Sequence, residues 1–240
     1  GEALWAERYD LDFLESQQRL DPLGFAALYQ QRPSVAAGTL FKREAMRYYE
    51  SADLPDDLRI YCASDHAVST KERRDYTVLL RVGLDRQDNI YLMDCIWKRM
   101  PSDEASEAML TMGGGNMRPL IWWAERGHIS QSIGPFLRKR QMETGTYFSI
   151  VEVTPVGDKE QRAQSIAARW AMGKVWLPKN APWTEKAVNE LLAFPNGNHD
   201  DFVDACSLIG LGLRSAHGKG KKEEPTKPPA FGTTAWVKLN

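Results

Sequence analysis

The fold and its site are decided near the end of the chain, where residues 194–211 read FPNGNHDDFVDACSLIGL. The Pro-Asn-Gly sequence predicts a turn, and the apolar run from Ala205 onward predicts a buried helix. Asp200, Asp201 and Asp204 lie in the first turn of this helix, at spacings of three and four residues that place them on nearly one side. Carboxylates this close repel one another, and burial strengthens the repulsion, so a compensating positive charge is required.

Two sources of that positive charge remain open. The N-terminal end of a helix favours negative side chains, which accounts for one or two of the three acids. A bound divalent cation accounts for all of them, because carboxylate oxygens are the ligands that Mg²⁺ and Mn²⁺ prefer. The second interpretation predicts that other acidic residues of the chain share the same ion.

Composition sets the class of protein before any motif is considered. The chain has 240 residues, of which 42% are hydrophobic and 26% charged, and its formal net charge is −1. This is typical of a soluble globular protein, and no apolar run reaches the length of a membrane span. A net charge near zero does not indicate a nucleic-acid-binding protein. Acids gathered at a site can, however, cancel the charge of basic patches in the net charge of the chain. Cys62, Cys95 and Cys206 lie in apolar segments without metal-ligand spacing, and we expect them to be buried and reduced.

The chain divides into three parts by composition and pattern. Residues 1–50 hold short helical stretches without a core of their own, and we expect them to form an N-terminal arm. Residues 51–216 alternate between strand and helix patterns, which predicts an α/β domain with a mixed β-sheet flanked by helices on both faces. Residues 217–240 are rich in Lys, Gly and Pro, and we expect a flexible tail.

Strand patterns predict how the sheet begins. Three β-rich runs at 59–64, 76–84 and 90–97 predict an antiparallel meander, and a buried strand at 119–124 ends at Glu125. Ser102 is the predicted N-cap of a helix at 103–112, and Asp158 with Gln161 fits a capping box at the start of a later helix. The other predicted segments are helices at 11–20, 25–31, 130–142, 158–173 and 183–194, and strands at 147–153 and 174–178.

Two further carboxylates end predicted strands. Asp65 follows the first strand of the meander, and Glu125 ends the buried strand. If these strands are parallel and adjacent, both carboxylates lie at the edge where α/β sheets form their sites, and the late helix brings its acids over that edge. Two divalent ions held there, about 4 Å apart, would clamp the attacking water and the leaving oxygen of a phosphodiester. For each acid taken alone, a turn, rim or helix-end role is the alternative.

This order of elements resembles the ribonuclease H-like superfamily of retroviral integrases and resolvases, and more closely the nuclease domain of the large terminase subunit of tailed bacteriophages. The segment at 25–33 is similar to the one that joins the terminase motor to its nuclease. The resemblance covers roughly residues 1–215. The other stretches that carry it are 63–65, 75–78, 90–94, 124–125 and 194–205.

The resemblance implies an endonuclease that cleaves concatemeric viral DNA during genome packaging in the host cytoplasm, by two-metal hydrolysis with Mg²⁺ or Mn²⁺. Asp65, Glu125 and Asp201 would be the catalytic triad that holds the metal. Asp204 matches an extra helix acid of resolvases, and Asp200 competes for the place of third ligand. Double-stranded DNA, the terminase motor domain, the small terminase subunit and the portal are the implied partners, and the N-terminal arm would come from the motor.

Other residues have weaker assignments. Asp75 and His199 are expected beside the metal ligands, and His128 is a weaker candidate, each with a turn, cap or surface role as the alternative. The basic residues that would line a DNA channel, or else form solvated helix faces, are Arg138, Lys139, Arg140, Lys159, Arg162, Arg169 and Lys174.

Two other functions stay open. Gly113-Gly114-Gly115 lacks the Lys-Ser/Thr of a phosphate-cradling loop, so no ATPase motor is expected within these residues. The chain could be a resolvase-like nuclease for branched DNA. It could also be a non-enzymatic docking module of the packaging assembly, whose acids are only helix-end charges.

Overall fold

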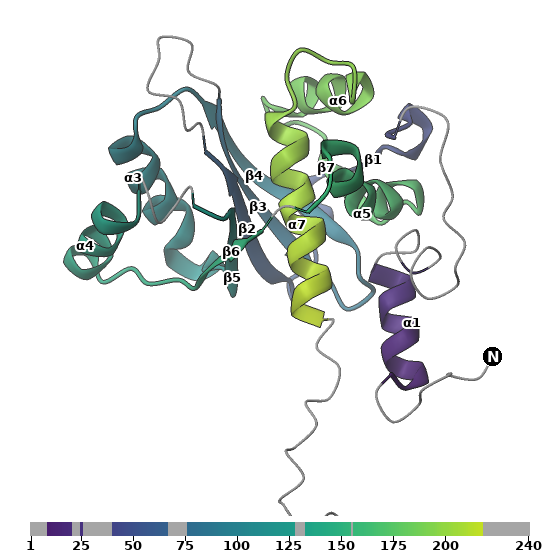
Figure 1. Ribbon diagram of the computed structural model, residues 1–240, viewed down its shortest axis with the longest axis horizontal. Helices are drawn as coiled ribbons and strands as arrows, with labels where there is room; N and C mark the ends of the chain where they lie inside the picture. The colour runs from purple at the N-terminus through teal and green to yellow at the C-terminus, as the bar shows by residue number, and fades with distance from the viewer. Residues whose placement is uncertain are drawn as a thin grey trace, which may run out of the picture.

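The structure is a computed structural model that describes residues 9–20, 25, 40–66, 76–127, 133–154 and 156–217. These residues form a seven-stranded mixed sheet with helices on both faces, which confirms the predicted fold class (Figure 1). The predicted tail from residue 218 onward, and all of the predicted helix at 25–31 except Phe25, lie outside the described residues.

The strands and helices follow the predicted order. The strands are β1 (Arg47–Tyr49), β2 (Arg59–Asp65), β3 (Thr77–Leu84), β4 (Ile90–Lys98), β5 (Ile121–Glu125), β6 (Ile150–Val153) and β7 (Val175–Pro178). The helices are α1 (Leu11–Leu20), α3 (Ser102–Gly113), α4 (Gly134–Thr144), α5 (Lys159–Ala171), α6 (Thr184–Ala193) and α7 (Asp201–His217).

The predicted N-cap residues can be compared with the observed starts of α5 and α3. Asp158 is the N-cap of α5, and its carboxylate accepts a hydrogen bond of 2.8 Å from the backbone N–H of Gln161, as predicted. The prediction that Ser102 caps α3 is wrong by one residue. The first bond of that helix runs from the N–H of Ala105 to the carbonyl of Pro101, so Ser102 is already helical. The strand β1 was not predicted, because three residues are too few to show a periodicity.

The sheet order is β1-β7-β4-β3-β2-β5-β6. The strands β2, β3 and β4 form the predicted antiparallel meander. Every other neighbouring pair in the sheet is parallel, so β3 alone runs opposite to the remaining strands of this sheet. The carboxyl ends of β2, β4 and β5 therefore meet at one edge, which is where α/β sheets form their sites.

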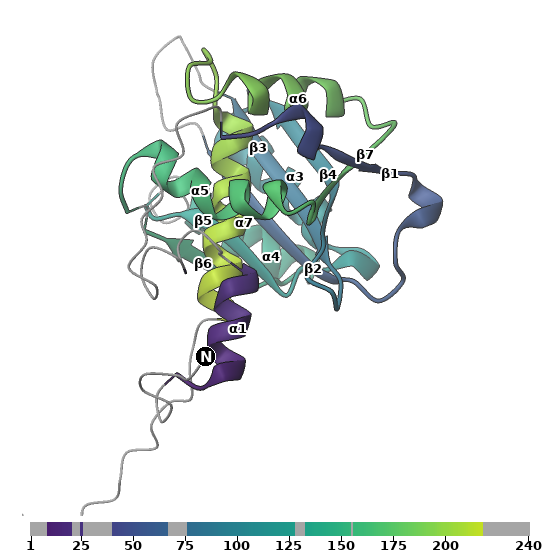
Figure 2. The ribbon, with the colours of Figure 1, turned by 90° about the vertical axis from the view of Figure 1, so that its right-hand side faces the viewer.

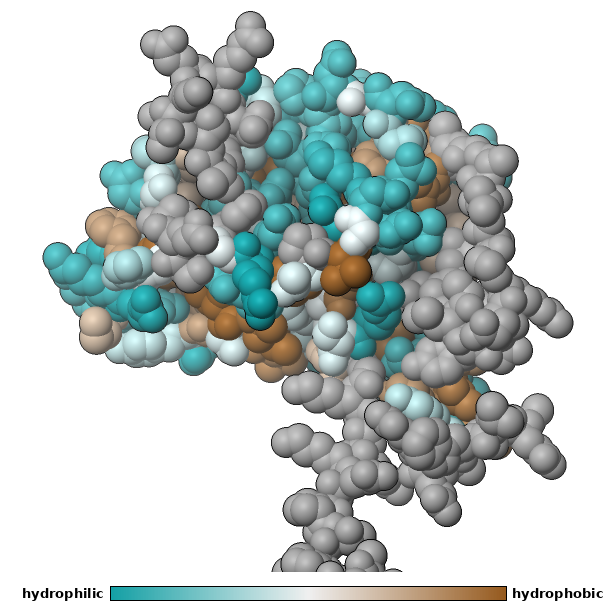
Figure 3. All heavy atoms as spheres, in the orientation of Figure 1, coloured by the Kyte–Doolittle hydropathy of each residue, from teal (hydrophilic) through white to brown (hydrophobic). Residues whose placement is uncertain are grey.

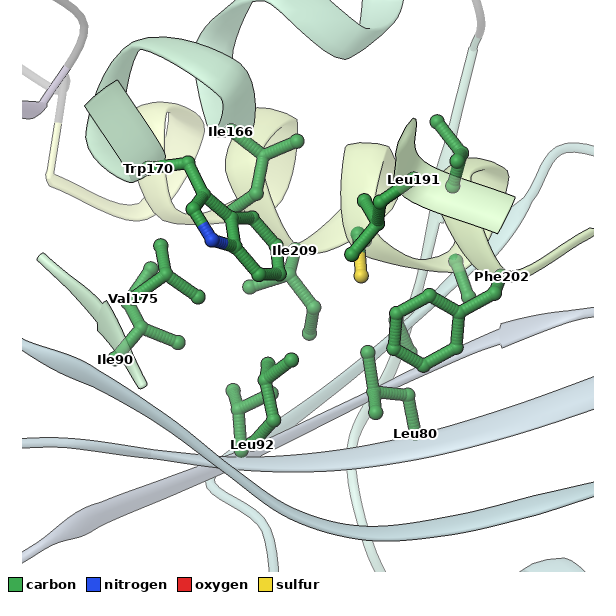
Figure 4. Close-up of a cluster of buried hydrophobic side chains, with 14 of the residues drawn as sticks. Leu80, Ile90, Leu92, Ile166, Trp170, Val175, Leu191, Phe202 and Ile209 are labelled. Carbon is green, nitrogen blue, oxygen red and sulfur yellow. The ribbon is translucent and has the colours of Figure 1, made fainter. Parts of the chain in front are cut away.

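Helices cover the two faces of the sheet unequally. The helices α3 and α4 lie over one face, while α5, α6 and α7 lie over the other (Figure 1). The larger hydrophobic core lies on the second face, where Leu80 and Leu92 of the sheet point toward Phe202 and Ile209 of α7 (Figure 4). This core holds α7 across the strands that carry the predicted site.

The helix α7 approaches its neighbours closely because it contains two glycines. A Cβ atom at Gly212 would lie 2.2 Å from the ring of Trp123, and one at Gly210 would lie 2.4 Å from the hydroxyl of Ser165. Distances this short leave no room for a side chain, so these glycines allow α7 to contact both β5 and α5.

The N-terminal helix α1 is tied to the same body, beside α7 (Figure 2). Arg169 of α5 is only 1% exposed, and its guanidinium donates hydrogen bonds to the carbonyls of Leu20 (2.9 Å) and Asp88 (3.1 Å). The prediction that Arg169 could line a DNA channel is therefore wrong. Phe41 and Tyr49 are also buried, so the core includes residues before position 50.

Candidate active site

The ends of β2 and β5 bring the first two predicted carboxylates together. The strands are parallel neighbours, and Ser64 pairs with Ala124, so Asp65 and Glu125 follow at equivalent positions at the edge of the sheet. The indole N–H of Trp122 donates a 2.9 Å hydrogen bond to the hydroxyl of Ser64. This buried contact ties the two strands together one residue before the carboxylate of β2.

The first turn of α7 brings the remaining acids to this edge. Glu190 of α6 accepts hydrogen bonds from the backbone N–H groups of Phe202 (2.7 Å) and Val203 (3.2 Å). Free N–H groups at a helix start need such acceptors, so this carboxylate fixes the start of α7. Asp201 is only 9% exposed as a result of the packing around it. Sequence reasoning did not find Glu190, because no local pattern links it to a helix start twelve residues later.

Electrostatic coupling shows that four acids converge. The pKa of Asp65 is raised from 3.8 to about 8, first by burial and then by the negative charges of Asp204, Asp201 and Glu125. Burial also raises the pKa of Asp204, and the charge of Asp200 adds to that effect. Acids from two strands and one helix thus repel one another in a single place.

The helix α5 supplies two positive charges to one side of the cluster. The ammonium of Lys159 lies 2.5 Å from the carboxylate of Asp200 and 3.5 Å from that of Asp204. The guanidinium of Arg162 lies 3.3 Å from Asp204. Asp200 and Asp204 have ion-pair partners on α5, and Asp201 lines a cavity on the α6 side.

These oxygen donors suit a hard divalent cation. All the converging groups are carboxylates, and their mutual repulsion is what a bound cation relieves. Within the described ranges, no group of three or more His, Cys, Asp or Glu side chains is gathered closely enough to hold one ion. The side chains would therefore have to turn toward an ion, and Asp200 and Asp204 would exchange part of their contact with Lys159 for it.

Other predicted residues lie around or away from the cluster. His199 is exposed and meets the ring of Tyr76 edge-on, with the ring centroids 5.8 Å apart. Asp75 and His128 lie outside the described residues. Arg138, Lys139 and Arg140 lie on α4, which covers the opposite face of the sheet from α7.

The α4 cations also have local partners. Lys139 lies 3.8 Å from the carboxylate of Glu143 one turn later, and Arg140 pairs with Glu143 and with Glu107 of α3. On the α7 side of the molecule, hydrophilic residues predominate at the end where α6 and the start of α7 lie (Figure 3). The structure thus places the acidic cluster at a polar end of the molecule.

The sheet order, the covering helices and the carboxylates at the ends of β2 and β5 define a ribonuclease H-like α/β protein. A sequence profile described as the terminase RNase H-like domain matches residues 63–211, which is more than half of the chain. The chain therefore belongs to the terminase RNase H-like domain family. A search of curated protein sequences found no match.

Two solved structures with TM-scores above 0.5 support this fold, and a third similar structure falls just below that score. The manganese-soaked terminase nuclease domain of human cytomegalovirus has a TM-score of 0.53 at 12% identity, over 72% of this chain and 94% of that one. A large terminase of a thermophilic bacteriophage in complex with ADP has a TM-score of 0.52 at 11% identity, over 83% of this chain and 51% of that one. The large terminase nuclease of thermophilic phage G20c with bound magnesium has a TM-score of 0.49 at 16% identity, over 73% and 98%.

The helices in the described part of the chain were compared with the requirements for crossing a membrane. None of its helices combines the length and the apolar character needed to cross a bilayer.

Proposed function

We propose that this chain is a metal-dependent DNA endonuclease, the nuclease part of a large terminase, which cleaves concatemeric viral DNA during genome packaging in the host cytoplasm. The observation that carries the proposal is the convergence of Asp65, Glu125, Asp201 and Asp204 at one edge of the sheet, where burial and then the neighbouring negative charges raise the pKa of Asp65 to about 8. Membership of the terminase RNase H-like family supports the same activity.

The cofactor of this activity is Mg²⁺ or Mn²⁺, with two ions bound. Asp65, Glu125 and Asp201 hold the metal, with Asp204 as the additional ligand from α7, and Asp200 is the weaker candidate because Lys159 already pairs with it. Two bound divalent ions would supply Lewis-acid stabilisation of the attacking water and of the leaving oxygen of a phosphodiester. The cytomegalovirus nuclease domain of the same fold was soaked with manganese, which supports this choice of metal.

The residues around the ligands have positioning roles. Glu190 holds the start of α7, and therefore Asp201, through the N–H groups of Phe202 and Val203. Lys159 and Arg162 offset the charge of Asp204 and leave Asp65 as the acid whose charge is most costly without metal. Asp65 must be ionised to hold a cation, so cleavage is expected to rise with pH toward the alkaline range.

The partners follow from the family. Double-stranded DNA is the substrate, and a terminase motor domain, a small terminase subunit and a portal are the proteins with which the nuclease works. Residues 1–50 are proposed to lead from the motor to the nuclease domain at 51–216, followed by the tail at 217–240. The contact between α1 and α7 supports a physical connection between this arm and the nuclease.

The test is nicking of supercoiled plasmid by wild type, Asp65→Asn and a matched control, Asp57→Asn. Asp57 is an exposed acid that pairs with Arg86 beside the turn after β3, far from the cluster. We expect cleavage with Mg²⁺ or Mn²⁺, none with EDTA, full activity in the control and none in Asp65→Asn. A folded wild type that binds metal but never cleaves DNA would instead favour the docking module. A strong preference for four-way junctions over linear duplex would favour the resolvase-like nuclease.

A further inference from the structure

A second group of positive charges lies beside the acidic cluster, on the side of α6. A cavity of about 220 Å³ opens there between the start of β3, the end of β4, α6 and the loop before α7. Tyr76, Trp97 and Lys186 line it together with two carboxylates, Glu190 of α6 and Asp201, the predicted metal ligand on α7. A group bound in this cavity would therefore lie next to the proposed reaction centre.

Aromatic rings contact Lys186, which lines this cavity, and Arg99, which packs on Tyr76 beside the lining. The ammonium of Lys186 lies 3.5 Å from the ring centroid of Trp97 and 4.3 Å from that of Tyr76. The guanidinium of Arg99 lies 4.8 Å from the centroid of Tyr76. Trp97 in turn stacks on Phe202, with the centroids 5.3 Å apart and the planes at 18°. The cations are thus connected through packed rings to the residue that follows Asp201.

These charges are not cancelled by ion pairs. In the part of the chain that the structure describes, neither Lys186 nor Arg99 lies within ion-pair distance of a carboxylate, whereas Lys159 and Arg162 of α5 both do. An aromatic ring attracts a cation through its quadrupole and leaves the net charge in place. The α5 cations therefore pair directly with the protein's own acids. Lys186 interacts with Glu190 and Asp201 only beyond ion-pair distance, and its exposed ammonium can contact an anionic ligand.

We propose that Lys186 and Arg99, held by Tyr76 and Trp97, form a binding subsite for a backbone phosphate of the DNA strand that enters the acidic cluster. This proposal rests on the proposed nuclease function and adds to it the residues that position the strand. Phosphates follow one another along a strand of duplex DNA at about 3.4 Å of helix axis, so the neighbours of a phosphate held near Asp201 come within reach of this cavity. Such contacts fix the register of the strand without reading its bases.

The test is equilibrium binding of a fluorescent DNA duplex, measured by anisotropy in EDTA over a series of KCl concentrations. The variants are Lys186→Gln, Arg99→Gln and the charge-conserving Lys186→Arg. The matched control is Arg86→Gln, which removes an exposed charge in the turn after β3, at the opposite end of that strand from Tyr76. Thermal melting of each variant verifies that the fold is intact.

We expect Lys186→Gln to weaken DNA binding by roughly 10-fold, the effect of losing one charge-assisted hydrogen bond. We also expect it to reduce the slope of log affinity against log salt by about 0.9. Arg99→Gln is expected to act in the same direction, Lys186→Arg to restore binding, and Arg86→Gln to match wild type. At subsaturating DNA, nicking with Mn²⁺ should fall by a similar factor in Lys186→Gln and stay at the wild-type rate in Arg86→Gln.

Three outcomes would overturn the proposal. Wild-type affinity and salt slope in both Lys186→Gln and Arg99→Gln, with wild-type nicking intact, would refute the subsite and leave the nuclease function standing. Displacement of DNA by potassium phosphate beyond that of KCl at equal ionic strength, lost in Lys186→Gln, would assign the cavity to a free phosphate compound instead. A wild type that neither binds nor cleaves DNA would refute both the subsite and the proposed function.

Discussion

The two parts of α7 differ in almost every physical respect, although they belong to one continuous helix. Its first turn carries Asp201 and Asp204, whose charges add to the effect of burial in raising the pKa of Asp65 to about 8. The following turns bury Ala205, Ile209 and Leu213, each at most 1% exposed, against the sheet and α5. Burial of the apolar side chains in the later turns stabilises the helix and offsets the repulsion among the carboxylates at its first turn. Changes in the first turn should therefore alter chemistry, and changes in the later turns should alter stability.

The largest expected effect concerns three acids at the start of α7: Asp200 just before the helix, and Asp201 and Asp204 in its first turn. We expect Asp201→Asn to reduce metal-dependent cleavage by at least about 100-fold, the upper range for residues that merely support metal ligands. Asp204→Asn should reduce metal-dependent cleavage by a comparable or smaller factor. Asp200→Asn should cost the least, because Lys159 already pairs with that carboxylate. Plasmid nicking by the three variants, with melting temperatures as the check on folding, measures the order. If Asp200→Asn lost more cleavage activity than Asp201→Asn, Asp200 rather than Asp201 would be the third metal ligand.

The second effect is on stability against pH in the absence of metal. The pKa of Asp65 is about 8 in the folded state and 3.8 as its ordinary value, so between these values the folded state holds a proton that the unfolded state has lost. Stability contributed by this proton is present below pH 4 and disappears as pH rises toward 8, with a slope of at most about 1.4 kcal/mol per pH unit for this group. Glu190, with a pKa of about 7, acts in the same direction over a narrower window.

Asp65→Asn separates these contributions. In EDTA near pH 8 the variant should be more stable than wild type, and its stability should depend less on pH between 4 and 8. Urea unfolding at a series of pH values measures both. Equal pH dependence in the two proteins would mean that Asp65 is not the acid whose charge is costly.

The third effect belongs to the buried turns of α7. A Cβ atom at Gly212 would lie 2.2 Å from the ring of Trp123, so Gly212→Ala should destabilise the protein by about 1–3 kcal/mol through overpacking. Ser215→Thr adds a methyl group on the exposed side of the same helix and should change stability by less than about 0.5 kcal/mol. Urea unfolding checks both variants. If Gly212→Ala were as stable as Ser215→Thr, the close approach of α7 to β5 would be wrong.

The smallest expected effect concerns Glu190 of α6, which holds the first turn of α7. Glu190→Ala removes the acceptor of the Phe202 and Val203 N–H groups and should cost about 0.5–2 kcal/mol, the usual range for a lost helix cap. Glu190→Gln keeps a side-chain oxygen acceptor and should recover most of that loss. Because Glu190 also fixes the start of α7, Glu190→Ala should weaken Mn²⁺ binding in calorimetry as well as stability. Unchanged metal affinity would limit Glu190 to a structural role.

Local sequence patterns predicted the larger part of the fold. Each strand longer than three residues shows a β-rich run, and Asp158 was identified as a helix cap, because these features depend on neighbours in the chain. The predictions failed where residues distant in the chain determine strand pairing or the burial of a side chain. The strand β1 is three residues long and is defined by pairing with β7, which is more than a hundred residues later in the chain. Arg169 was a candidate for a DNA channel, but it is buried, and its guanidinium donates hydrogen bonds to the carbonyls of Leu20 and Asp88.

The sequence by itself determined which acids end strands and begin the late helix, since strand and helix periodicity and the spacing of Asp201 and Asp204 are local properties. Only the tertiary structure decided which charges meet. Parallel pairing of β2 with β5 places Asp65 beside Glu125, and the approach of α5 gives Lys159 to Asp200 and Asp204. The packing of α6 likewise places Lys186 over Trp97. Electrostatic energy depends on distance in space, and sequence spacing fixes that distance only within a single helix or strand.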